Sequence, residues 1–203
     1  MNVDYRPDFP VTDEACRAAT GRTFAEWFAF IDAAGLAEKR RDAIQAVYNE
    51  TGRGKDVWWA TTIWVELERA RGVVVKKDGR PEGFNICCTK SFKQAPDALF
   101  PHFATEAAFA AWVPGWSGAL TEGAAFRCGD ATGTVGRIRP AKDIRMVWSG
   151  PGYPPTEIEI QFNVMAGKTT VNVYHKRIGT RAEADGLRRA WADALDRLTT
   201  LAG

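Results

Sequence analysis

Histidine is scarce in this chain, and its scarcity removes most hydrolytic and metal-dependent chemistry. The 203 residues include two histidines, His102 and His175. Serine-type and cysteine-type catalytic triads need a histidine base, and zinc sites need clustered His and Cys ligands. We expect His102 to lie at the surface or at a rim, and His175 to be hydrogen-bonded at the end of a strand. The sequence therefore predicts no catalytic residues, no metal site and no cofactor.

Cysteine is too sparse and too irregularly spaced for a disulfide framework or a metal site. The four cysteines are Cys16, Cys87, Cys88 and Cys128, and no two have C-x-x-C spacing. Cys87 and Cys88 are neighbours, and neighbouring side chains on a strand point to opposite faces. We therefore expect four free thiols in a reducing cytoplasm.

Long apolar runs and an excess of one charge are missing as well. No stretch approaches the roughly 18 apolar residues of a membrane-spanning helix, and residues 1–15 are too charged for a secretory signal. The 27 basic and 25 acidic residues give a formal net charge of +2, which does not favour a nucleic-acid partner. The Gly-rich stretches 129–136 and 150–152 match no phosphate-binding motif, so we interpret them as turns.

The first 72 residues have the periodicity of a small helical bundle. We predict helices over about residues 12–20, 23–34, 37–50 and 57–71, separated by glycines that end helices well. Thr23 and Glu26 have the spacing of a capping box. Trp58, Trp59 and Trp64 widen the apolar surface of the fourth helix, as in a helix that is central to a bundle.

The period then changes to that of strands. Residues 76–81 are polar with Gly and Pro and predict a linker, so we divide the chain into a helical domain at 1–75 and a second domain at 82–203. The second domain is predicted to hold two short helices at 96–103 and 106–112. Its predicted strands cover 84–92, 125–128, 134–138, 144–148, 157–164 and 169–176.

Alternation is clearest in the predicted strand 157–164. Glu157 and Glu159 share its polar face, which we expect to meet water, while the opposite face carries Ile158, Ile160, Phe162 and Val164. Ala166-Gly167 predicts a tight hairpin turn. A long amphipathic helix is predicted to begin at a capping box formed by Thr180 and Glu183. Its apolar face carries Leu187, Trp191, Leu195 and Leu198 at helical spacing.

This element order predicts the α+β class, with an N-terminal all-α bundle followed by a curved antiparallel sheet around a long C-terminal helix. The second part resembles the helix-grip superfamily (SRPBCC) of START-like, Bet v 1-like and Hsp90-ATPase-activator-homologue-like domains. The stretches that carry this resemblance are 89–92, 98–112, 138–140, 144–148, 168–171, 175–178 and the helix around Trp191. The first part resembles a small uncharacterised helical domain (DUF4287-like), through residues 20–23, 26–28, 58–60 and 66–72.

The resemblance implies a tunnel between the sheet and the long helix. A largely apolar tunnel would suit a lipid-like or aromatic ligand. Large side chains could also fill the space completely, and the sequence leaves that alternative open. The expected lining residues come from the helical pair, the strands and the long helix: Phe103, Phe109, Trp112, Met146, Trp148, Ile160, Phe162, Val171, Val173, Leu187, Trp191 and Leu195.

Three functions remain compatible with the sequence. The first is a non-catalytic binding protein that holds an apolar or amphipathic small molecule. The second is a protein-interaction or co-chaperone-like module, with Trp58, Trp59 and Trp64 as an exposed patch. The third and weakest is a cyclase-type or hydrolase-type enzyme that uses polar groups such as Arg145, Tyr174 or His175. The basic residues Arg137, Arg139, Lys142 and Arg145 are expected on a solvated face, or touching an anionic group at the tunnel mouth.

Overall fold

The structure is a computed structural model, and it describes residues 1–52, 57–72 and 79–203. Two compact units are present: one contains Pro7–Phe84, and the other contains Met1–Arg6 with Asn85–Gly203. This differs from the division predicted from the sequence, because residues 1–6 pack with the second unit rather than with the helices that follow them. Part of the predicted linker, residues 76–78, lies outside the described residues.

The first unit is built from four helices: α1 (Asp13–Thr20), α2 (Phe24–Ala33), α3 (Arg40–Thr51) and α4 (Trp58–Arg71). The predicted capping box is confirmed, because the Thr23 side chain accepts from the Glu26 amide and the Glu26 carboxylate accepts from the Thr23 amide. The helix α3 begins at Arg40 rather than at residue 37. The chain before it forms a turn, in which the Lys39 amide donates to the Leu36 carbonyl.

The tryptophans of α4 do not form the exposed patch that the second hypothesis needs. Trp58, Trp59 and Trp64 are all buried. The rings of Trp58 and Trp59 meet edge-on with centroids 4.8 Å apart, and Trp58 also contacts Phe9. In the same unit, Arg40 joins the helices through an ion pair with the buried Glu68. These tryptophans therefore act as core residues of the helical unit.

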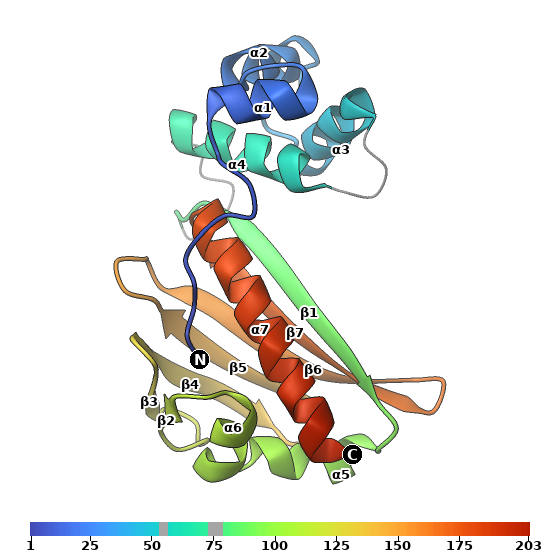
Figure 1. Cartoon of the computed structure of the whole chain (residues 1–203), viewed down its shortest axis with the longest axis vertical. Helices are drawn as coiled ribbons and strands as arrows, with labels where there is room; N and C mark the ends of the chain where they lie inside the picture. Colours follow the sequence, from blue (N-terminus) through green and yellow to red (C-terminus); the bar gives the residue numbers. More distant parts are fainter. Residues whose placement is uncertain (53–56, 73–78) are drawn as a thin grey trace. The chain divides into compact units, whose positions relative to one another are not determined.

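The second unit is a seven-stranded antiparallel sheet with a long helix across one face (Figure 1). The strand order is β1-β7-β6-β5-β4-β3-β2. The strands are β1 (Phe84–Phe92), β2 (Trp116–Ser117), β3 (Ala125–Cys128), β4 (Ala131–Arg139), β5 (Asp143–Ser149), β6 (Thr156–Met165) and β7 (Lys168–Ile178). The helices are α5 (Pro96–Leu99), the 3-10 helix η1 (Phe100–Phe103), α6 (Glu106–Trp112) and α7 (Arg181–Ala202). The predicted fold class is confirmed.

The alternation of β6 places its side chains largely as predicted. Ile158, Ile160 and Phe162 are buried. Val164 was predicted to share their buried face but is 66% exposed, because it lies near the end of the hairpin, beside the turn into β7. That turn has positive φ at both Ala166 and Gly167, as the tight hairpin requires.

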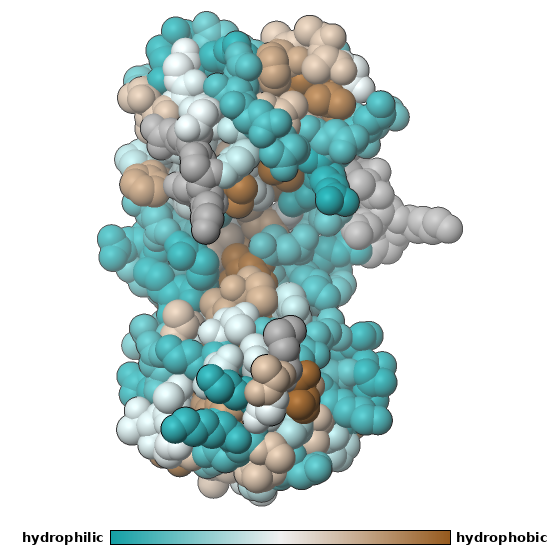
Figure 2. All heavy atoms as spheres, turned by 90° about the vertical axis from the view of Figure 1, so that its right-hand side faces the viewer, coloured by the Kyte–Doolittle hydropathy of each residue, from teal (hydrophilic) through white to brown (hydrophobic). Residues whose placement is uncertain are grey.

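Exposed large apolar side chains are scattered. Among residues 1–52, 57–72 and 79–203 they are Phe9, Val57, Val147, Val164 and Leu201. On the face drawn in Figure 2, hydrophobic areas are interrupted by hydrophilic ones in both units. Single apolar side chains at the surface are normal in globular proteins and indicate no binding site by themselves. None of the described helices is long and apolar enough to cross a membrane.

Candidate functional site

The twelve predicted tunnel residues all lie in the interior of the second unit, and all are buried. They come from η1, α6, the three strands β5, β6 and β7, and α7, as the resemblance implies. Their rings meet one another: the centroids of Phe103 and Phe162 are 4.7 Å apart, and those of Phe103 and Trp112 are 4.9 Å apart. Trp191 lies 6.4 Å from both Trp112 and Trp148. The structure therefore packs the six aromatic members of the predicted set against one another, and contact of the set with a ligand stays a prediction.

A chain of hydrogen bonds crosses this apolar interior. Nε1 of Trp191 donates to Nδ1 of His175 across 3.2 Å. An indole N–H can only donate, so Nδ1 accepts and the neutral ring carries its proton on Nε2. Nε2 then donates to Oγ1 of Thr156 across 2.6 Å, and Oγ1 donates to the Trp148 carbonyl across 3.1 Å. Every step in this chain has one donor and one acceptor.

His175 is therefore a structural residue rather than a general base. Its side chain is fully buried, and burial lowers the pKa of the imidazole to about 3. Its two ring nitrogens are both engaged. The prediction that it ends a strand is wrong, because β7 continues to Ile178 and His175 points into the core. The sequence analysis did not predict this inward position, because two basic residues, Lys176 and Arg177, directly follow His175.

The other two residues suggested for catalysis lie on the opposite side of the sheet. Arg145 pairs across the strands with Glu159, and Glu159 pairs with Tyr174. These three residues share the outer face, whereas His175 and Trp148 lie on the inner face, where Trp191 of α7 contacts both. A single site cannot combine Arg145 and Tyr174 with His175, because the sheet separates them.

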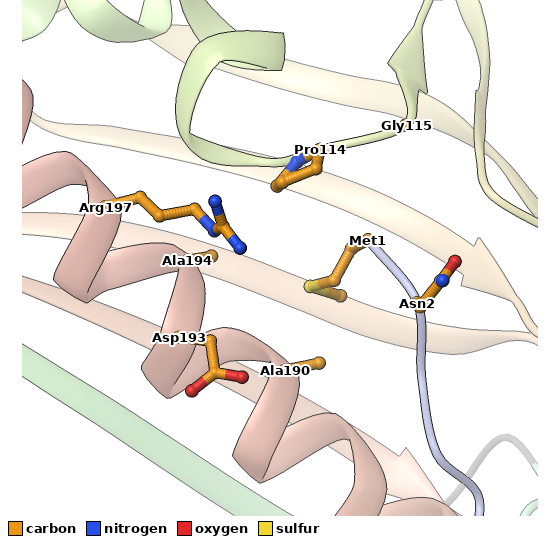
Figure 3. A pocket seen from close by; sticks show the side chains of 8 residues that line it. All are labelled: Met1, Asn2, Pro114, Gly115, Ala190, Asp193, Ala194 and Arg197. Carbon is orange, nitrogen blue, oxygen red and sulfur yellow. The ribbon is translucent and has the colours of Figure 1, made fainter.

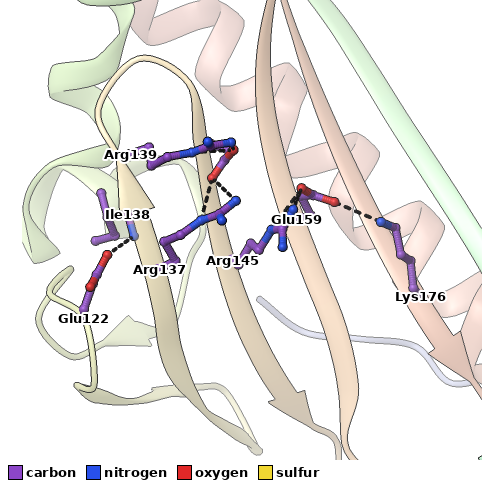
Figure 4. Close-up of polar contacts among 8 residues, drawn as sticks. Glu122, Arg137, Ile138, Arg139, Arg145, Glu159 and Lys176 are labelled. Carbon is purple, nitrogen blue, oxygen red and sulfur yellow. Dashed lines mark hydrogen bonds and ion pairs between the residues drawn. The ribbon is translucent and has the colours of Figure 1, made fainter. Parts of the chain in front are cut away.

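The outer face carries a network of paired charges (Figure 4). Asp143 accepts from both Arg137 and Arg139, and these hydrogen bonds hold the pKa of Asp143 below its usual value. Glu159 was expected to face water but is buried, because Arg145 and Lys176 cover it at 2.8 and 2.9 Å. Three members of the predicted basic set are therefore neutralised by carboxylates.

Two buried polar atoms in the described part of the second unit have no hydrogen-bond partner. They are Nε1 of Trp148 and Oε1 of Glu183. Glu183 is fully buried in the first turn of α7, and burial raises the pKa of its carboxyl group to about 7. Its other oxygen accepts from the Gly179 amide, and its own amide donates to Thr180. An unpartnered buried polar atom costs free energy, and both of these atoms lie in the packed interior of the unit.

Residues 1–6 lie along one side of α7, in a groove that sequence reasoning missed. Met1 is buried, Val3 and Tyr5 are partly buried, and the alternate residues Asn2, Asp4 and Arg6 are exposed. The alternation of Met-Asn-Val-Asp-Tyr-Arg was the available signal. Burial, and then the nearby charge of Glu183, raises the pKa of Tyr5 to about 12.

Two pockets flank this N-terminal segment. The first has a volume of about 340 Å³ and is shown in Figure 3. There the Met1 side chain points toward α7, and the Arg197 guanidinium reaches toward Pro114. The second pocket, of about 370 Å³, is lined by Met1–Tyr5 together with Cys128, Asp130 and Ala131. Both pockets mix apolar and charged side chains, and neither is lined by any of the twelve predicted tunnel residues.

The structure also places His102 and the four cysteines. His102 is partly exposed, in line with its expected place at a surface or rim. All four cysteines are free. Across residues 1–52, 57–72 and 79–203, no group of three or more His, Cys, Asp or Glu side chains is placed to hold a metal ion.

Comparison with known proteins agrees with this architecture. The model of the family described as "Activator of Hsp90 ATPase homolog 1-like protein" matches residues 93–203. No curated protein matches the chain. A model for the DUF4287-like resemblance of the first part is not among these matches.

Several solved structures resemble the second unit. CalU16 from Micromonospora echinospora is 21% identical, with a TM-score of 0.53 over 59% of this chain and 76% of its own. PFC0360w, an HSP90 activator from Plasmodium falciparum, is 16% identical, with a TM-score of 0.52 over 59% of this chain and 96% of its own. MLL2253 from Mesorhizobium loti is 12% identical, with a TM-score of 0.52 over 58% and 96%. At these identities the likeness shows the fold alone.

Proposed function

Since residues 93–203 match its model, the chain belongs to the family of Activator of Hsp90 ATPase homolog 1-like proteins, and we propose that it is a non-catalytic binding protein. Its ligand is an apolar or amphipathic small molecule that binds between α7 and the sheet. The cytoplasmic location expected from four free thiols belongs to the same proposal, as does the DUF4287-like type of the helical unit.

The observation that carries this proposal is the pair of pockets beside residues 1–5. Their volumes of about 340 and 370 Å³ lie at the lower end of the range for small-molecule sites. In the first pocket, Met1, Ala190 and Ala194 supply an apolar wall, while Asp193 and Arg197 stand at its edge. This combination favours a ligand with an apolar body and a polar or charged end.

The unpartnered atoms of Trp148 and Glu183 do not bear on these pockets, because neither residue lines them. The twelve predicted residues line neither pocket and pack as the core between α7 and the sheet. The engaged nitrogens of His175 favour binding without chemical conversion.

Mass spectrometry of the purified protein, first under native and then under denaturing conditions, tests this proposal. We expect a discrete additional mass that is released on unfolding, or that appears after incubation with a lipid extract. An Ala190→Phe substitution places a ring in the first pocket and should abolish the additional mass. Ala192→Phe is the matched control, because Ala192 is exposed on the same helix. A protein that stays free of ligand in both preparations would contradict the proposal.

A protein-interaction or co-chaperone-like role is the second candidate. The family description and the outer face of the sheet favour it, because Arg137, Arg139, Arg145 and Lys176 are held in fixed positions there by Asp143 and Glu159. Ordered charges give an interface specificity. Stimulation of the ATPase of an Hsp90-type protein, lost on charge reversal of Arg145, would favour this role over ligand binding.

A further inference from the structure

The groove beside α7 is shaped around the backbone of residues 1–6. A Cβ atom at Gly186 would lie 2.4 Å from the Asp4 carbonyl oxygen, a separation that real Cβ atoms essentially never show. At Gly115 and Gly129 a Cβ would lie 3.0 Å from the Met1 nitrogen and the Met1 carbonyl oxygen. Three glycines from different parts of the chain therefore leave room for one extended segment.

Gly186 is the most informative of the three. It lies inside the helix α7, where glycine is a poor helix former and alanine would be preferred. Its place there has a structural reason in the close approach of the Asp4 carbonyl. Gly186 therefore lowers the helix propensity of α7 at the position where the N-terminal segment crosses this helix.

The segment is held mainly by side chains, since residues 1–6 belong to neither a helix nor a strand. The Arg189 guanidinium donates to the carbonyls of Asp4 and Arg6, at 2.9 and 2.8 Å. Tyr5, between these two anchors, and Val3, just before them, are partly buried, and the Tyr5 hydroxyl would lie 2.8 Å from a Cβ at Gly150. This mode of holding, by backbone acceptors and alternate side chains, is the one proteins use for extended peptides.

We propose that residues 1–6 form a strap that closes the ligand groove and moves aside when the ligand enters. This inference rests on the proposed function. The two pockets that share Met1 and Asn2 in their walls become one groove when the strap leaves. An extended segment of six residues spans roughly 20 Å, so the groove suits an extended amphipathic molecule of similar length rather than a compact one.

The test uses the full chain with Gly186→Ala, which adds one methyl group where the strap backbone lies. Gly179→Ala is the matched control, because nothing lies within 4 Å of its Cβ position. Two readouts are measured: hydrogen exchange of the amides of residues 2–6, and fluorescence titration with the apolar probe 1-anilinonaphthalene-8-sulfonate. We expect Gly186→Ala to speed exchange of these amides at least tenfold and to tighten probe binding at least fivefold. Gly179→Ala should change neither.

Unchanged exchange in Gly186→Ala would overturn the strap. Faster exchange without tighter probe binding would show that the strap does not close the groove. Absence of any ligand in the mass spectra would contradict the proposed function alone, because neither readout depends on a natural ligand. If Gly186→Ala does not fold, Arg189→Met removes two hydrogen bonds to the strap without adding an atom beneath it. It should then shift both readouts in the same direction, and no shift in exchange would overturn the proposal.

Discussion

Trp191 of α7 donates a hydrogen bond to His175 of β7 across 3.2 Å, and this bond begins a chain that ties the helix to three strands. His175 passes the connection to Thr156 on β6, and Thr156 passes it to the backbone of Trp148 on β5. This series of hydrogen bonds fixes α7 over the middle of the sheet, next to the groove that we propose for the ligand. Buried polar networks of this kind specify one arrangement of a core when every member is satisfied.

Replacing Trp191 with phenylalanine should show how much the hydrogen bond from Trp191 to His175 contributes to the free energy of unfolding. Trp148→Phe is a matched control, because both indoles are fully buried while Nε1 of Trp148 has no partner. Both substitutions remove the same volume, but only Trp191→Phe leaves Nδ1 of His175 without a donor. We expect Trp191→Phe to lower the free energy of unfolding by about 1–3 kcal/mol more than Trp148→Phe. Equal losses in urea unfolding would show that the bond contributes nothing.

The buried imidazole predicts a loss of stability in mild acid. In the unfolded chain His175 binds a proton near pH 6.5, whereas burial lowers its pKa in the folded protein to about 3. Below pH 6.5 the unfolded state therefore binds more protons, and the free energy of unfolding falls as the pH falls. The full effect would approach about 5 kcal/mol at pH 3. His175→Gln keeps one donor and one acceptor and should lose this dependence, as measured by denaturant unfolding at a series of pH values.

Glu183 predicts the opposite slope in an overlapping range. Burial raises its pKa from 4.5 to about 7 in the folded protein, so the folded state binds more protons than the unfolded state between these values. The free energy of unfolding should therefore fall as the pH rises from 4.5 to 7, by up to about 3 kcal/mol. Glu183→Gln should remove this slope and leave the acid sensitivity of His175 and of the carboxylates with lowered pKa values, such as Asp143 and Glu159. A Glu183→Gln protein whose free energy of unfolding still fell as the pH rose from 4.5 to 7 would contradict the assignment.

The element order was readable from the sequence because each element carries its own local signal. Strand β1 and helix α6 have the predicted bounds, and the hairpin at Ala166-Gly167 has the predicted turn. The two-residue strand β2 was missed, since Trp116-Ser117 is too short for any alternation to show. The helix α3 was predicted three residues too early because the turn before it has helix-forming residues.

The candidate site was only partly readable. The twelve buried residues were predicted from periodicity together with the tunnel that the family resemblance implies, but the groove beside α7 depends on a close approach between Asp4 and Gly186, 182 positions apart in the numbering of the chain. No local pattern reports such a contact. The burial of Glu159 was not predicted, for a similar reason. Alternation indicates which face of a strand a side chain lies on, but it does not indicate which neighbours cover that face. Arg145 and Lys176 come from two other strands.

Glu159 and Glu157 form a matched pair for the charge network on the outer face, since both belong to β6 and point the same way. Burial alone would raise the pKa of Glu159, but hydrogen bonds from Lys176, Gln161 and Arg145 hold that pKa below its usual value. Glu157 is half exposed, and it pairs with Arg177 at 3.9 Å. Glu159→Gln should therefore lower the free energy of unfolding by about 1–3 kcal/mol, because it leaves two cations without their shared anion.

Glu157→Gln should change the free energy of unfolding by less than about 0.5 kcal/mol, since exposed ion pairs contribute little. Denaturant unfolding at pH 7 measures both values, and repeating it in 1 M salt should shrink the cost of Glu159→Gln only in part, because the pair is shielded from solvent. Losses of similar size in the two variants would mean that Glu159 behaves as an ordinary surface charge. The outer face would then keep Asp143 with Arg137 and Arg139 as its fixed charges, which would weaken the co-chaperone-like alternative.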